Sequence, residues 1–209
     1  MIELRPRFRA ALEALDTVRA EEVLQRVLAA NTSLETVERL IVPVMEELGA
    51  EWDAGQLALS QIYMSSRMCE QIVDRLFRPG TACLKPGPRM AVTVLCDYHL
   101  LGKRIVYSVM RASGYDILDY GRLEVGDLAD RIAADRLEIL LVSVLMLPSA
   151  LKVRELRTAL EARQARVRIA VGGAPFLFDA ALWREVGADA MGRTATDAVK
   201  LVERWTEAS

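Results

Sequence analysis

Ten residues near the middle of the chain, 79–88, divide the sequence into two parts with different patterns. They contain three prolines and two glycines, a composition that breaks helices and strands. Before them, apolar residues recur at helical spacing; after them, short apolar runs alternate with helical segments. The sequence therefore predicts two domains, at residues 1–78 and 89–209, with residues 79–88 as the linker.

The first part predicts a four-helix bundle. Apolar residues spaced three and four apart mark a helical stripe over residues 7–15, 19–30, 34–48 and 57–77. Thr32 to Glu35 has the form of a capping box, which starts the third helix. Pro43 lies inside that helix, where we expect a kink, and we expect Gly49 to end it.

The second part predicts an α/β fold with a doubly wound parallel sheet, of flavodoxin-like or Rossmann-like type. Residues 138–144 are dominated by Ile, Leu and Val, as expected of a strand buried on both faces. The other strands are expected at residues 90–95, 116–120, 167–171 and 189–191. Helices are expected between and after them, at residues 102–113, 125–134, 150–162, 178–186 and 196–206.

Composition excludes several classes of protein. The formal net charge of −2 lacks the basic excess of nucleic-acid-binding domains. The N-terminus lacks the apolar core of a signal peptide, and no stretch reaches the ~18 apolar residues of a membrane span. We therefore expect a cytoplasmic protein without membrane or nucleic-acid partners. Three cysteines without a CxxC pair argue against a disulfide framework and a structural zinc site.

The only histidine of the chain, His99, lies in the turn that follows the first predicted strand. Asp97 lies two residues before it and Gly102 three residues after it. Further candidate residues end the third and fourth predicted strands or follow them closely: Ser143, Leu145, Ser149, Gly172 and Gly173. Ligands of doubly wound sheets bind at the carboxyl ends of strands, so we expect these residues to line one site.

The patterns DxHxxG at 97–102, SxL at 143–145 and GG at 172–173 resemble the signature of cobalamin-binding Rossmann-like domains. Such domains occur in methionine synthase, in the base-off mutases and in the small corrinoid proteins of methyltransferase systems. The helical part resembles the cap of the methyl-transferring members, so the resemblance covers essentially the whole chain. Three motifs in order are more specific than one short pattern. The resemblance implies cobalamin as the cofactor, as methylcobalamin or another corrinoid.

The resemblance also implies a role for each residue of the turn. His99 would replace the cofactor's own dimethylbenzimidazole as the lower axial ligand of the metal, and imidazole is a good ligand for cobalt. Asp97 would fix the tautomer of the histidine through its other ring nitrogen. Ser149 would extend this contact into a proton relay.

The displaced nucleotide tail of the cofactor would lie in a slot between the third and fourth strands. Gly102 and the glycine pair at 172–173 would let it pass, because no Cβ stands in the way. Ser143 would hydrogen-bond the buried benzimidazole. Leu147 stands where methionine synthase has a threonine, which would make the slot less polar.

In the helical part, Trp52, Tyr63, Met64 and Met68 would cover the upper face of the corrin. The segment 48–55 also resembles the cap of cobalamin-dependent photoreceptor regulators, but Gln61-Ile62 stand where those usually have a Glu-His pair.

Simpler interpretations stay open at this point. His99 could be an ordinary loop histidine, Asp97 a helix N-cap, Ser143 an incidental buried hydroxyl and the glycine pair 172–173 only a turn. The cap residues could be ordinary bundle core or interface residues.

The function that the resemblance implies is that of a corrinoid protein, which binds cobalamin base-off with His99 on and carries a methyl group between methyltransferases. It would be a non-catalytic carrier subunit, because the cofactor does the chemistry. Its partners would be corrinoid methyltransferases and a reductive activator. One alternative is a cobalamin-dependent sensor that acts through a protein partner, and another is a flavodoxin-like domain that binds no cobalamin. The methyl donor, the upper ligand and the oligomeric state stay open.

Overall fold

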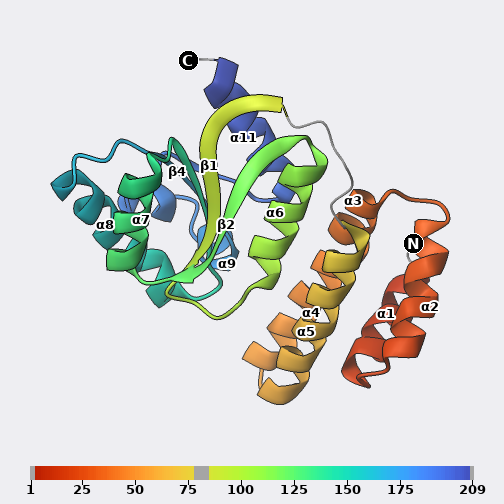
Figure 1. Cartoon of the computed structure of the whole chain (residues 1–209). Coiled ribbons are helices and arrows are strands. Elements are labelled where there is room, and N and C mark those ends of the chain that lie inside the picture. Colours follow the sequence, from red (N-terminus) through yellow and green to blue (C-terminus); the bar gives the residue numbers. More distant parts are fainter. Residues whose placement is uncertain (1–2, 78–84, 208–209) are drawn as a thin grey trace. The chain divides into compact units, whose positions relative to one another are not determined.

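The computed structural model describes residues 3–77 and 85–207, except the side chains of Asp53, Lys85 and Pro86. The chain forms two compact units, Met1–Arg78 and Pro79–Ser209 (Figure 1). Residues 79–84 of the predicted linker lie outside the described residues. Residues 85–88 of that linker belong to the first strand, which begins at Lys85 rather than at the predicted Met90.

The first unit is a bundle of helices, as the spacing of its apolar residues predicts. Its elements are α1 (Leu4–Glu13), α2 (Thr17–Leu28), α3 (Ser33–Thr36), the π-helical turn η1 (Val37–Ile41), α4 (Val42–Asp53) and α5 (Leu59–Leu76). Its core is filled by large, fully buried side chains: Phe8, Leu12, Leu40, Ile41 and Leu48. The predicted capping box is confirmed, because Thr32 and Glu35 each accept a hydrogen bond from the other's backbone N–H, at 3.0 and 3.2 Å.

The third helix of the bundle differs from the prediction in two ways. The irregularity expected at Pro43 takes the form of η1, a wider turn in which Val42 donates to the carbonyl five residues before it. Such a turn accommodates a proline, which has no N–H to donate. The prediction that Gly49 ends the helix is wrong. α4 continues to Asp53, and Gly55 follows with a φ of +71°, the left-handed conformation that often terminates helices.

The second unit is a five-stranded sheet, and the predicted doubly wound parallel fold is confirmed. Its elements are β1 (Lys85–Leu95), α6 (Leu101–Ala112), β2 (Tyr115–Leu123), α7 (Val125–Asp135), β3 (Ile139–Ser143), α8 (Leu147–Ala162), β4 (Arg168–Gly172), α9 (Ala174–Phe178), α10 (Leu182–Glu185), β5 (Ala190–Met191) and α11 (Ala195–Glu207). The strand order is β2-β1-β3-β4-β5, with all pairs parallel.

Helices cover both faces of this sheet. α7, α8, α9 and α10 pack on one face, and α6 and α11 pack on the other; Figure 1 shows α7 and α8 on the opposite side of the sheet from α6. The chain passes from β1 outward to β2 and then returns to the other side of β1 to form β3. The turns after β1 and β3 therefore lie at the point where the strand order reverses, which is where open α/β sheets bind ligands.

One helix of the second unit was predicted incorrectly. Residues 178–186 were expected to form a single helix, whereas α9 ends at Phe178 and α10 begins at Leu182. Asp179 between them is extended, and its carboxylate accepts a hydrogen bond from the N–H of Ala181 at 2.8 Å. This local hydrogen bond competes with the helical one and breaks the helix.

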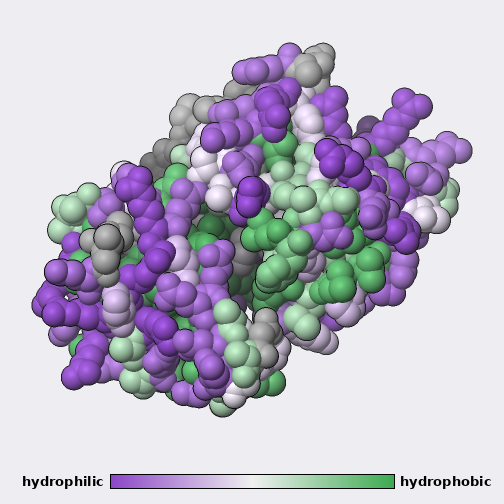
Figure 2. All heavy atoms as spheres, turned by 180° about the vertical axis from the view of Figure 1, so that it is seen from behind, coloured by the Kyte–Doolittle hydropathy of each residue, from purple (hydrophilic) through white to green (hydrophobic). Residues whose placement is uncertain are grey.

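Hydrophilic residues cover much of the face drawn in Figure 2, with apolar residues gathered in patches between them. Within residues 3–77 and 85–207, no helix is both long and apolar enough to cross a membrane.

Candidate functional site

The candidate residues of the second unit meet at the carboxyl edge of the sheet. Val94, near the end of β1, pairs with Ser143 of β3, and Ser143 pairs with Gly172 of β4. The turn that carries Asp97 and His99 therefore starts beside the ends of β3 and β4. Parallel strands end at the same edge, and this common edge brings together residues that are up to ~75 positions apart in the sequence.

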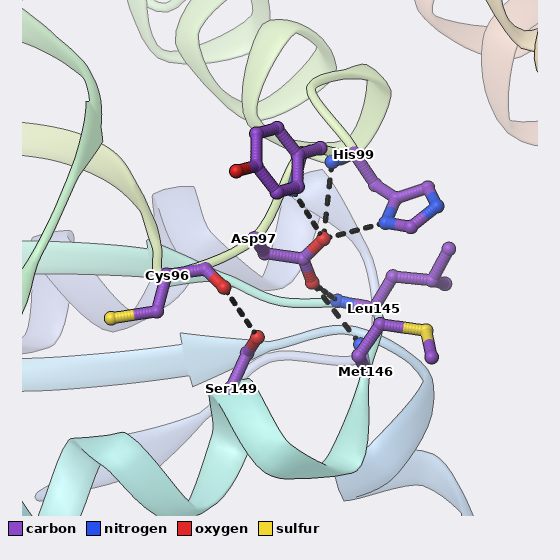
Figure 3. Close-up of polar contacts among 7 residues, drawn as sticks. Cys96, Asp97, His99, Leu145, Met146 and Ser149 are labelled. Atoms are coloured by element: carbon purple, nitrogen blue, oxygen red, sulfur yellow. Dashed lines mark hydrogen bonds and ion pairs between the residues drawn. The ribbon is translucent and has the colours of Figure 1, made fainter.

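Asp97 and His99 form a close pair within this turn (Figure 3). Oδ1 of Asp97 lies 2.5 Å from Nδ1 of His99 and also accepts the N–H groups of Tyr98 and His99. An ionised carboxylate only accepts, so Nδ1 is the nitrogen that donates, and in the neutral imidazole the lone pair is then on Nε2. The Asp97 side chain is 1% exposed and that of His99 is 46% exposed. The pair thus presents one oriented ligand nitrogen toward the surface.

The second carboxylate oxygen of Asp97 joins the turn to α8. Oδ2 accepts hydrogen bonds from the backbone N–H groups of Leu145, at 2.7 Å, and Met146, at 3.1 Å, just before α8 begins (Figure 3). Asp97 does not cap the helix that follows it, because α6 has Leu100 at its N-cap. Burial opposes ionisation of Asp97, but the hydrogen bonds from His99, Leu145 and Met146 hold its pKa well below the usual range.

Ser149 makes a contact other than the one expected for a proton relay. Its hydroxyl donates to the backbone carbonyl of Cys96 at 2.9 Å, and not to the carboxylate of Asp97 (Figure 3). The oxygens of Asp97 instead receive the donors of Tyr98, His99, Leu145 and Met146. The predicted Asp97–Ser149 contact is therefore absent from the described site, although Ser149 is close to the turn.

Each glycine of the predicted slot lies close to an atom of a neighbouring residue. An ideal Cβ on Gly102, in the first turn of α6, would approach the Ser143 hydroxyl to 2.7 Å. A Cβ on Gly172 would lie 3.1 Å from the carbonyl of Gly192. Gly173 has a φ of +119°, and a Cβ there would lie 1.7 Å from the carbonyl of Val144. The glycine pair is thus more than a turn, since other backbone approaches both positions closely and leaves no space for a side chain at Gly173.

Exposed apolar side chains follow the end of β3. Leu145 and Met146 are 44% and 40% exposed, and Leu147, the first residue of α8, is 54% exposed. Their backbone is fixed by Asp97 and α8, whereas their side chains are directed to solvent. An apolar rim of this kind suits a flat, largely apolar ligand.

The predicted cap residues belong to the helical unit. Trp52 is half-buried near the end of α4. Tyr63 and Met64 are 60% and 43% exposed on α5, so they are not part of the bundle core, whereas Met68 of the same helix is buried. Their role in covering a cofactor stays a prediction.

Sequence reasoning missed several residues of the site. Gly192 follows β5 and faces Gly172 through its carbonyl, and a glycine just after the last strand was the available signal. Cys96 has a φ of +50°, which the sequence does not reveal. Arg122 places its guanidinium 4.1 Å from the centre of the Tyr98 ring. Among the described residues, no group of three or more His, Cys, Asp or Glu side chains is arranged to hold a metal ion.

Comparison with known proteins identifies relatives along nearly the whole chain. Two family models, each described as a B12 binding domain, match residues 4–77 and 89–203. A trimethylamine corrinoid protein of Methanosarcina barkeri is 26% identical over 210 residues, covering 96% of this chain and 95% of that protein. Monomethylamine corrinoid protein 1 of Methanosarcina acetivorans is 31% identical over 193 residues, covering 86% and 87%. The solved structure of the Methanosarcina barkeri monomethylamine corrinoid protein matches with a TM-score of 0.80 and 25% identity, covering 95% and 96%.

Proposed function

Because the chain belongs to the family of B12-binding corrinoid proteins, we propose that it holds the corrinoid with His99 as the lower ligand of cobalt and the nucleotide base displaced. We further propose that it carries a methyl group between methyltransferases. The observation that carries the first proposal is the pairing of Asp97 with Nδ1 of His99, which leaves Nε2 free at the carboxyl edge of the sheet.

The residues at this edge fit such a cofactor. Neutral imidazole is a good ligand for cobalt, and a carboxylate on its other nitrogen fixes the ring and raises its basicity. At Gly102 and Gly172 the walls of the proposed slot carry no side chain, and the hydroxyl of Ser143 lies beside Gly102, where it is available to a buried polar group. The apolar rim formed by Leu145, Met146 and Leu147 suits the corrin ring.

The bound corrinoid would supply the methyl-transfer chemistry itself, and the protein would supply binding and orientation. Asp97 holds the proton on Nδ1, so that His99 presents its ligand nitrogen in one tautomer. The backbone N–H groups of Leu145 and Met146 hold Asp97 and so fix the direction of the ring. These hydrogen bonds thus restrain the side chain of His99 before the cofactor binds, which lowers the entropic cost of binding.

The carrier role is supported by the names of the relatives, which are trimethylamine and monomethylamine corrinoid proteins. We propose corrinoid methyltransferases as partners and a reductive activator as a further one. The alternative role, a cobalamin-dependent sensor, predicts that light changes the oligomeric state of the adenosylcobalamin-loaded protein. Gel filtration before and after illumination tests this, because a carrier is expected to keep its oligomeric state.

The lower ligand can be tested without ambiguity because the chain has one histidine. The protein is produced with ¹⁵N-labelled histidine, loaded with cobalamin and reduced to Co(II) for electron paramagnetic resonance. We expect the axial nitrogen splitting to change from three lines to two on labelling, because ¹⁵N has nuclear spin one half. If the splitting keeps three lines in the labelled protein, the cofactor's own base stays bound and the proposal is refuted. The His99→Ala variant is the control, since it should lack the label-dependent splitting.

A further inference from the structure

Cys96 connects β1 to the turn that carries the proposed cobalt ligand, and its backbone has an unusual conformation. Its φ is +50°, in the left-handed region that residues with a Cβ rarely adopt. Single residues persist in such conformations only when the surrounding structure holds them there. The contacts of Cys96 therefore show what fixes the direction of Asp97 and His99.

Two hydrogen bonds with other elements hold this residue. Its N–H donates to the carbonyl of Leu123, the last residue of β2, at 3.1 Å. Its carbonyl accepts the hydroxyl of Ser149, which lies on α8 and is 5% exposed, at 2.9 Å. The sulfur of Cys96 points away from His99 (Figure 3).

We propose that Ser149 is a positioning residue for the cofactor ligand, and that its hydroxyl acts by holding the left-handed peptide of Cys96. The inference rests on the proposed function, in which His99 binds cobalt. The peptide that Ser149 holds is the one that joins Cys96 to Asp97. Rotation of that peptide would move the Asp97 carboxylate away from the N–H groups of Leu145 and Met146.

The geometry favours this role over a relay of protons to Asp97. A serine hydroxyl has one proton to donate, and here that proton is given to the carbonyl of Cys96. Within the turn, Asp97 forms a side-chain hydrogen bond with His99 alone. Ser149 thus acts on the ligand through the backbone of the turn.

The test measures the binding of aquocobinamide, a corrinoid that lacks the nucleotide tail, by its visible spectrum. Without the tail, binding depends more strongly on the lower ligand. We expect Ser149→Ala to raise the dissociation constant about five-fold, which corresponds to about 1 kcal/mol at 1.4 kcal/mol per factor of ten. Ser149→Thr retains the hydroxyl and should stay within about two-fold of the wild type.

A second substitution distinguishes positioning from a general loss of stability. Glycine adopts a positive φ without strain, so Cys96→Gly should need the Ser149 hydroxyl less. We expect adding Ser149→Ala to Cys96→Gly to weaken binding less than about two-fold. Val153→Ala is the matched control, because Val153 is fully buried one turn further along α8 and has no hydroxyl to donate to Cys96. It should reduce the thermal stability of the apoprotein and leave the dissociation constant unchanged.

Each outcome decides between the proposals. The proposed function predicts that the wild type changes the spectrum of the corrinoid and that His99→Ala does not. If the two proteins give the same spectrum, the proposed function fails. If that change is present but Ser149→Ala binds like the wild type, the positioning role is refuted. Equal weakening by Ser149→Ala in the Cys96→Gly background, or by Val153→Ala, would also refute it. If Ser149→Ala does not fold, Ser149→Cys replaces it, since a thiol is somewhat larger than a hydroxyl, fills the site and is a weak donor.

Discussion

Gly102→Ala separates binding of the nucleotide tail from stability of the fold. In the structure without a cofactor, the new methyl would lie 2.7 Å from the Ser143 hydroxyl, so that side chain must turn aside, at a cost of about 0.5–1.5 kcal/mol. Alanine is better than glycine within a helix by up to about 1 kcal/mol. These two effects nearly cancel, so we expect the free energy of unfolding to change by about 1 kcal/mol or less.

Binding of cobalamin should change far more. A methyl group placed in a filled slot costs about 1–3 kcal/mol by overpacking, which is about 5- to 150-fold in the dissociation constant. Aquocobinamide has no nucleotide tail to place beside Gly102, so its dissociation constant should change by about two-fold or less. Spectral titration of the variant and the wild type with both corrinoids gives the fold-change in each dissociation constant.

A matched control is available in the same unit. Gly126 is the second residue of α7, as Gly102 is of α6, and a Cβ on Gly126 would have nothing within 4 Å. Gly126→Ala should therefore bind both corrinoids like the wild type. Equal losses of cobalamin and cobinamide binding by Gly102→Ala would show that the tail does not pass Gly102. Unchanged binding of cobalamin would refute the assigned slot altogether.

Four further predictions concern stability and are checked by urea or thermal unfolding of the apoprotein. Gly173→Ala should cost more than about 4 kcal/mol, because its Cβ would lie 1.7 Å from a backbone carbonyl oxygen at a φ of +119°; a loss below about 1 kcal/mol would contradict this. Asp119→Ala should cost about 3–5 kcal/mol, because it leaves Lys103, 5% exposed, as an unpaired buried charge. Adding Lys103→Met should recover most of that loss, and no recovery would refute the role of the ion pair. Thr32→Ala should cost about 1 kcal/mol through loss of the capping box, and an unchanged unfolding midpoint would count against it. Burial raises the pKa of Cys69 from 9.0 to about 12. Above about pH 9 the unfolded chain therefore releases a proton that the folded chain retains, and the free energy of unfolding falls. Cys69→Ala should show a smaller fall between pH 8 and pH 10, and an equal fall would refute this cause.

The sequence predicted the parts of the fold that depend on local pattern. The strand at 138–144 was recognisable because a strand buried on both faces has no polar alternation, and β3 covers residues 139–143. The end of α4 was not recognisable, because Gly49 has a helix-breaking propensity that the packing of Leu48 in the core outweighs. The break at Asp179 depended on one hydrogen bond to a backbone N–H, which no periodicity records.

The site was predictable to a similar depth. Motif spacing placed Asp97 and His99 in one turn, and their contact follows from that nearness in sequence. The hydrogen-bond partner of Ser149 was not predictable, because two acceptors lie near the start of α8: the carbonyl of Cys96 and the carboxylate of Asp97. Which of them Ser149 binds depends on which acceptor already receives other hydrogen bonds. Four backbone N–H groups, those of Tyr98, His99, Leu145 and Met146, donate to Asp97, and backbone groups leave no mark in the sequence.

This use of backbone donors has a consequence for what each residue of the SxL motif specifies. Asp97 is bonded to the N–H groups of Leu145 and Met146, so the contact requires the position of these two residues and not their side chains. Both side chains are exposed, so neither is required for the core of the sheet unit. This contact requires one particular side chain, the carboxylate of Asp97. It does not require a leucine at position 145, so the choice of leucine there must depend on a contact that its exposed side chain makes. In the proposed function, the side chain of Leu145 contacts the corrin ring. The same short segment therefore positions the lower ligand through its backbone and contacts the ring through its side chains.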